Sequence, residues 1–73
     1  MTDNPSPPSA EEQCIEFIHE MLGMIKMHCE VAQTYCEMRD LVGLEYQLRR
    51  MVPTIKSAIE TFKEAKALGD GEK

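Results

Sequence analysis

The chain has 73 residues, a net charge of −5 and three cysteines without a CxxC pair, which together exclude several classes of protein. A negative net charge disfavours binding to nucleic-acid phosphates and to anionic lipid. Six methionines, no tryptophan and an odd cysteine count are not typical of a disulfide-stapled secreted domain. We therefore expect one small cytoplasmic domain with reduced thiols, no nucleic-acid partner and no membrane span.

The two ends of the chain lack the pattern of a folded element. Residues 1–8 contain three prolines among small polar residues, which cannot propagate a helix, and have neither the basic nor the apolar region of a signal peptide. Residues 69–73 begin Gly-Asp-Gly, which stops a helix. We expect disordered tails at 1–8 and 69–73, and one helical domain over residues 9–68.

The first predicted helix begins at a capping box. Ser9 is followed three residues later by Glu12, so that each side chain can bond the backbone N–H of the other residue. Acidic residues crowd the first turns, where the helix dipole favours negative charge. The helix is expected to run to about Arg39.

Two apolar stripes run along this helix, both with the alternating three- and four-residue spacing of a heptad pattern. The first stripe consists of Ile15, Ile18, Leu22, Ile25, Cys29, Ala32 and Cys36. The second consists of Phe17, Met21, Met24, His28, Val31, Tyr35 and Met38. A helix with two apolar stripes needs two sets of neighbours, so the pattern predicts a protein that works by contact with other helices.

The residue types of the two stripes differ, and this difference predicts their roles. The first stripe is rich in branched side chains and is expected to form the fixed core of the fold. The second stripe combines flexible methionines with aromatic side chains, a mixture suited to fitting a partner surface. All seven residues of the second stripe are therefore the predicted partner-binding residues.

A second helix is predicted after a short turn. The heptad spacing of the first helix slips between Arg39 and Gly43, and a new apolar stripe begins at Leu41. Asp40 is suited to cap the new helix, and Gly43 to take unusual backbone dihedrals. The new stripe consists of Leu41, Leu44, Leu48, Met51, Ile55, Ala58, Phe62 and Ala65.

Pro53 lies inside the second stripe and leaves two arrangements open. The heptad spacing continues through it without slipping, which favours a single second helix kinked at Pro53. The alternative is a three-helix bundle with separate helices over 41–51 and 54–68.

The charges agree with an antiparallel hairpin. The first half is acidic and the second half is mostly basic, so that Lys63 and Lys66 are expected beside the acidic start of the first helix. The predicted fold is therefore all-α, a helical hairpin of two long antiparallel helices. Because so short a chain buries little surface, we expect it to dimerise into a four-helix bundle.

No catalytic constellation or cofactor site is predicted. His28 and Cys29 are adjacent, so their side chains diverge by about 100° on a helix and do not form a nucleophile pair. Met21, Met24 and Met27 could with Cys29 and His28 bind Cu(I), but methionines more often fill a helix interface, so no metal site is predicted.

The sequence therefore predicts a non-enzymatic protein-interaction module. Such an acidic helical protein would act as a small regulator, an inhibitor or an assembly chaperone. A structural homodimeric four-helix bundle and a metal or redox carrier are the alternatives.

Overall fold

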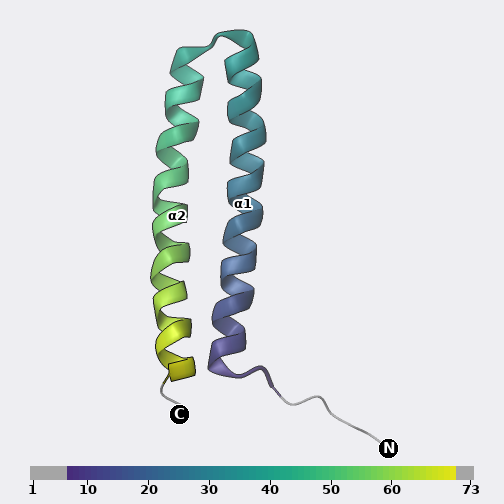
Figure 1. Cartoon of the computed structure of the whole chain (residues 1–73). Coiled ribbons are helices and arrows are strands. Elements are labelled where there is room, and N and C mark those ends of the chain that lie inside the picture. The colour runs from purple at the N-terminus through teal and green to yellow at the C-terminus, as the bar shows by residue number, and fades with distance from the viewer. Residues whose placement is uncertain (1–6, 71–73) are drawn as a thin grey trace, which may run out of the picture.

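The computed structural model describes residues 7–70 and shows two helices packed side by side in opposite directions (Figure 1). Helix α1 spans Ala10–Met38 and helix α2 spans Leu41–Asp70. No strand occurs among the described residues. The predicted all-α helical hairpin is confirmed. Of the predicted tails, residues 1–6 and 71–73 lie outside the described range, whereas Gly69 and Asp70 belong to α2.

The start of α1 is fixed by the predicted capping box. The Glu12 N–H donates to the Ser9 Oγ at 3.1 Å, and the Ser9 N–H donates to the Glu12 Oε1 at 2.9 Å. Each bond satisfies a backbone N–H at the helix start, where no intrahelical partner exists. The prediction from the sequence is confirmed at this end of the helix.

The turn between the helices is built by Arg39 and Asp40. Arg39 has left-handed dihedrals (φ 58°, ψ 33°), and the Asp40 N–H donates to the Tyr35 carbonyl at 2.9 Å, which is a Schellman-type end for α1. The Asp40 carboxylate then accepts from the Gly43 N–H at 3.0 Å and caps α2. The chain thus reverses within two residues.

Gly43 has a different role from the one predicted. It lies inside α2 with no positive φ, so the unusual dihedrals belong to Arg39 instead. A Cβ added at Gly43 would lie 2.5 Å from Cε1 of Tyr35. The glycine is needed because the tyrosine ring packs directly on the α2 backbone.

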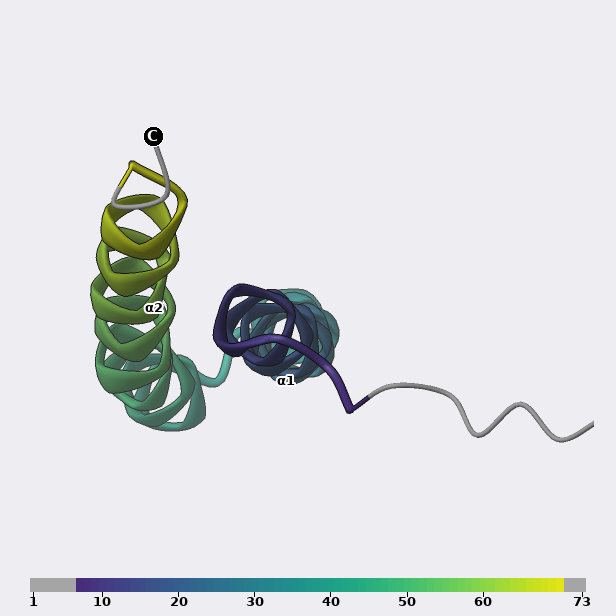
Figure 2. The same cartoon turned by 90° about the horizontal axis from the view of Figure 1, so that it is seen from below.

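Helix α2 is a single helix that includes Pro53, which confirms the predicted long second helix and excludes the three-helix alternative. Proline has no N–H, so the Arg49 carbonyl four residues earlier lacks its helical partner. Figure 2, which looks nearly along α1, shows α2 inclined to α1.

The helices meet along one row of residues on each, which we name the interhelical row. All of its members are buried or half-buried: Cys14, Ile18, Met21, Ile25, His28, Ala32 and Tyr35 on α1, and Leu44, Gln47, Met51, Thr54, Ala58, Thr61 and Ala65 on α2. Only His28, Ala32 and Ala65 are less than a tenth exposed. The hairpin alone therefore has a thin core.

This row corrects the predicted division of α1 into a core stripe and a partner stripe. Ile15 and Leu22, expected in the core, are each 54% exposed, whereas Met21 of the second stripe is half-buried in the row. The contact line lies between the two stripes and takes alternate residues from each. Both stripes were similarly apolar, so α2 settles along their midline and buries half of each.

The ion pairs also differ from expectation. Among residues 7–70, the two ion pairs are Arg49 to Glu45 at 2.8 Å and Lys63 to Glu60 at 3.7 Å, both within α2 and both exposed. The predicted pairing of Lys63 and Lys66 with the start of α1 is absent. Exposed pairs of this kind contribute little to stability, so the hairpin is held mainly by the interhelical row.

Candidate interaction surfaces

Most large apolar side chains lie outside the interhelical row. Fifteen of them are exposed, whereas the buried apolar residues among the described part of the chain are two alanines. Most of these exposed side chains gather on two opposite sides of the plane that contains both helix axes. The candidate functional sites of this chain are therefore surfaces.

Helix geometry assigns each exposed residue to a side. On either helix, the residue after a contact residue lies about 100° further round. Two antiparallel helices that face each other are related by a two-fold axis perpendicular to their common plane. Equivalent positions on α1 and α2 therefore lie on the same side of the hairpin.

One side, which we name the wide apolar face, receives an apolar row from each helix. Its members are Ile15, Leu22, Cys29 and Cys36 of α1 and Leu41, Leu48, Ile55 and Phe62 of α2. The Cys29 Sγ lies 3.9 Å from the Met51 Sδ, so the α1 row reaches the adjoining edge of α2. Val52 and Ile59, both about half exposed, extend this face along α2.

The two rows of the wide apolar face are in register. The contacts from His28 to Gln47, from Tyr35 to Gly43 and from Cys14 to Glu64 join residues at the same height along the hairpin. With the contact from Cys29 to Met51, residue numbers at one height thus add to between 75 and 80. The wide apolar face accordingly forms four layers: Ile15 with Phe62, Leu22 with Ile55, Cys29 with Leu48, and Cys36 with Leu41.

The opposite side, which we name the narrow apolar face, is apolar on α1 only. Its α1 row is Phe17, Met24, Val31 and Met38, and the facing α2 positions are Gly43, Arg50, Ser57 and Glu64. The Arg50 guanidinium donates to the Tyr46 hydroxyl at 2.9 Å and lies 5.5 Å from the centre of its ring. A polar border therefore runs along α2 beside the apolar α1 row.

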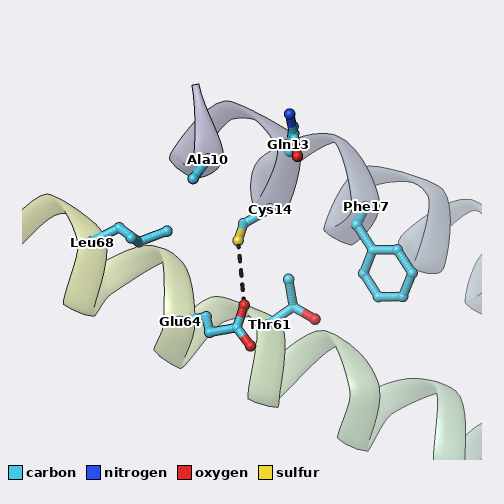
Figure 3. A pocket seen from close by; sticks show the side chains of 7 residues that line it. All are labelled: Ala10, Gln13, Cys14, Phe17, Thr61, Glu64 and Leu68. Carbon is cyan, nitrogen blue, oxygen red and sulfur yellow. Dashed lines mark hydrogen bonds between the residues drawn. The ribbon is translucent and has the colours of Figure 1, made fainter. Parts of the chain in front are cut away.

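A shallow pocket lies on the narrow side at the open end of the hairpin (Figure 3). It has a volume of about 360 Å³ and is lined by Ala10, Gln13, Cys14, Phe17, Thr61, Glu64 and Leu68. The Cys14 thiol donates to the Glu64 Oε1 at 3.8 Å. Burial raises the pKa of the Cys14 thiol, and the negative charges of Glu64 and Glu11 add to the rise. The surroundings of Cys14 thus disfavour the thiolate.

The seven predicted partner-binding residues separate into two groups. Phe17, Met24, Val31 and Met38 lie together on the narrow apolar face. Met21, His28 and Tyr35 lie in the interhelical row instead. The four that share the narrow face remain the candidate partner-binding residues.

His28 and Gln47 form a polar contact within the interhelical row. The His28 Nδ1 lies 2.8 Å from the Gln47 Oε1, and His28 is 8% exposed. An amide oxygen only accepts, so the Nδ1 carries the proton in this orientation of the amide. A buried polar pair of this kind fixes the register of two helices, because any slip would leave its members unsatisfied. Periodicity alone did not reveal this pair.

The surface rows of α2 were not anticipated as a candidate site. Leu41, Leu48, Ile55 and Phe62 belong to the predicted second-helix stripe, which was expected to pack against α1. The structure places them beside the contact, at exposures from 41% to 75%. A signal was available in the sequence, because Gln47, Thr54 and Thr61 follow the same heptad spacing one position earlier.

The described residues show no clustered metal-ligand set and no membrane-crossing helix. No three His, Cys, Asp or Glu side chains within residues 7–70 are grouped as metal ligands would be. Neither α1 nor α2, as described, has an apolar stretch that would cross a bilayer. Cys14, Cys29 and Cys36 are free thiols.

Comparisons with protein-family models, with curated proteins and with solved structures find no match. The candidate surfaces therefore rest on the residues and geometry of this chain.

Proposed function

We propose that the chain is a non-enzymatic protein-interaction module that binds a helix of another protein on its narrow apolar face. In this role it would act as a small regulator, an inhibitor or an assembly chaperone. The observation that supports the proposal is the continuous α1 row on that face, in which Phe17, Met24 and Met38 are 41%, 42% and 62% exposed. Aromatic and methionine side chains are favoured at adaptable helix-binding surfaces.

The charged residues on both sides of the narrow apolar face indicate what kind of helix would fit there. Glu20 flanks the row on α1 and Glu64 flanks it on α2, so both edges near the open end carry negative charge. An amphipathic helix with basic residues beside its apolar stripe would pair with both. The pocket beside Phe17 would receive one apolar side chain of that helix.

Site-specific photo-crosslinking in the host cell tests the proposal. A benzoylphenylalanine at position 24 is expected to give a covalent adduct with one protein of different sequence. The same group at position 42 serves as a matched control, because Val42 is 81% exposed and lies on the outside of α2. Phe17→Glu should abolish the adduct from position 24.

Two results would contradict this assignment. Equal adducts from positions 24 and 42 would show that the narrow apolar face has no preferred partner. An adduct between two copies of the chain would assign the face to self-association.

A second candidate function is a structural homodimeric bundle. The observation that favours it is the α2 row of the wide apolar face, which the narrow apolar face lacks. The two functions are compatible, because they use opposite sides of one hairpin.

A further inference from the structure

We infer that the wide apolar face is covered by a second copy of this chain, arranged so that α1 of each copy packs against α2 of the other. This inference rests on the second candidate function, the homodimeric bundle, and adds to it the residues and the orientation of the interface; it is independent of the partner proposed for the narrow apolar face. Its two parts, the occupant and the orientation, rest on different observations.

The size of the face argues for a large interface. Six leucine, isoleucine and phenylalanine side chains in its four layers are between 41% and 75% exposed. With the two exposed cysteines, Val52 and Ile59, the face comprises ten exposed apolar side chains. Covering all of them needs an interface of standard size, on the order of 800 Å² on each partner. Contiguous apolar patches above about 300 to 600 Å² are rare on monomers.

The shape of the face argues for a second copy as the occupant. Each helix contributes one residue to every layer, and successive layers are seven residues apart. Helix pairs that pack together in a four-helix bundle have the same arrangement. A single partner helix would cover only part of so broad a surface. A second hairpin carries the same two rows with the same four layers, so it matches the surface along its full length.

Charge selects the orientation of the second copy. Between Ala10 and Met38 the chain has six acidic residues and one lysine, whereas between Leu41 and Leu68 it has five basic and three acidic residues. A two-fold axis parallel to the helices places the acidic α1 of each copy beside the mostly basic α2 of its partner. An axis across the helices would instead place α1 on α1, so like charges would face each other.

The residues at the outer edges of the wide apolar face also favour the two-fold axis parallel to the helices. At equal heights along the bundle, Glu12 of one copy lies beside Lys66 of the other, and His19 lies beside Ile59. The crossed axis would bring Lys26 of both copies together near the middle of the face. The parallel axis therefore gives one favourable ion pair at each edge and avoids a repulsive one.

The mass of the full chain tests the occupant. Sedimentation equilibrium at 1 to 100 μM is expected to show a dimer for the unmodified chain. Leu48→Glu should raise the dissociation constant of the dimer at least about a hundredfold, because two charges enter one apolar interface. Val42→Glu is the matched control, since Val42 is exposed on the outside of the same helix, and it should leave the dimer intact.

A monomeric unmodified chain at 100 μM would overturn the inference and assign the wide apolar face to another protein. A dimeric Leu48→Glu variant would overturn it as well. Either result leaves the photo-crosslinking test of the narrow apolar face unaffected.

Disulfide formation between two variants tests the orientation. In a background with Cys14→Ala, Cys29→Ala and Cys36→Ala, one chain carries His19→Cys and the other carries Ile59→Cys. The parallel axis places these positions on adjacent helices at the same height, so the mixture should oxidise to a mixed disulfide. With the crossed axis they lie on diagonally opposite helices, and the absence of the mixed disulfide in a dimeric sample would overturn the orientation.

Discussion

The wide and narrow apolar faces start from similar rows on α1 and differ because of α2. Ile15 and Leu22 flank the interhelical row on one side, and Phe17 and Met24 flank it on the other. On the wide side α2 adds a second apolar row, whereas on the narrow side it places Gly43, Arg50, Ser57 and Glu64. The composition of α2 therefore makes the apolar surface broader on one side of the hairpin than on the other.

The residue types reinforce this difference. Leucine and isoleucine dominate the wide apolar face and lose little side-chain freedom on burial, which suits a fixed interface. Two of the four α1 residues of the narrow apolar face are methionines, which adapt to the shape of a partner. A small hairpin can thus combine a permanent contact on one side with an exchangeable contact on the other.

The largest expected effect on stability comes from comparing a charge in the interhelical row with a charge on the wide apolar face. Ile25 lies in the row and is half-buried, whereas Leu22 lies on the wide apolar face at 54% exposure. Ile25→Glu should reduce the free energy of unfolding by about 3 kcal/mol, because a charge loses water against α2. Leu22→Glu should keep the helical circular-dichroism signal at high concentration while weakening self-association.

This expectation replaces the one from the sequence, which placed Leu22 in the fixed core of the fold. If Leu22→Glu unfolds the hairpin while Ile25→Glu leaves it folded, the row has been assigned to the wrong side of α1. Thermal melts at several concentrations distinguish the outcomes, since only loss of association makes the melting temperature independent of concentration.

Local signals made the fold predictable, whereas the surfaces depended on how the helices meet. The capping box at Ser9, the Asp40 cap and the uninterrupted stripe through Pro53 each act over a few residues and were read correctly. The contact line between the helices was not predicted, because both α1 stripes were apolar. Polar residues such as Gln47 and Thr54 occupy α2 contact positions, where a search for apolar periodicity does not find them.

Gly43 of α2 and Gly23 of α1 provide the next test, which concerns the packing of the Tyr35 ring on α2. Gly43→Ala should destabilise the hairpin by about 1 to 3 kcal/mol, because the new methyl group would overlap the Tyr35 ring. Gly23→Ala is the matched control: nothing lies within 4 Å of its added Cβ, and the substitution should stabilise α1 by about 1 kcal/mol. Urea unfolding of both variants measures the difference. Equal effects would show that the ring does not pack on Gly43.

Pro53 tests whether α2 needs a proline within the helix. It is exposed within a continuous helix, so Pro53→Ala restores a backbone hydrogen bond without removing a packed side chain. We expect stabilisation of about 1 kcal/mol, measured by thermal unfolding at a fixed concentration. A clear loss of stability would indicate that α2 needs the backbone geometry of the proline.

The smallest expected effect is on the reactivity of Cys14, at the open end of the narrow apolar face. Its raised pKa leaves less thiolate at pH 8 than an ordinary thiol has, so alkylation should be slow and should still accelerate above pH 9. Glu64→Gln removes the charge and weakens the acceptor, which lowers the pKa toward its usual value. In a chain with Cys29→Ala and Cys36→Ala, the iodoacetamide rate at pH 8 should then rise about two- to fivefold.

Glu60→Gln is the control on the same helix, because Glu60 is exposed and pairs with Lys63. An unchanged or slower rate in Glu64→Gln would show that the carboxylate does not act on this thiol, and that burial alone suppresses its ionisation.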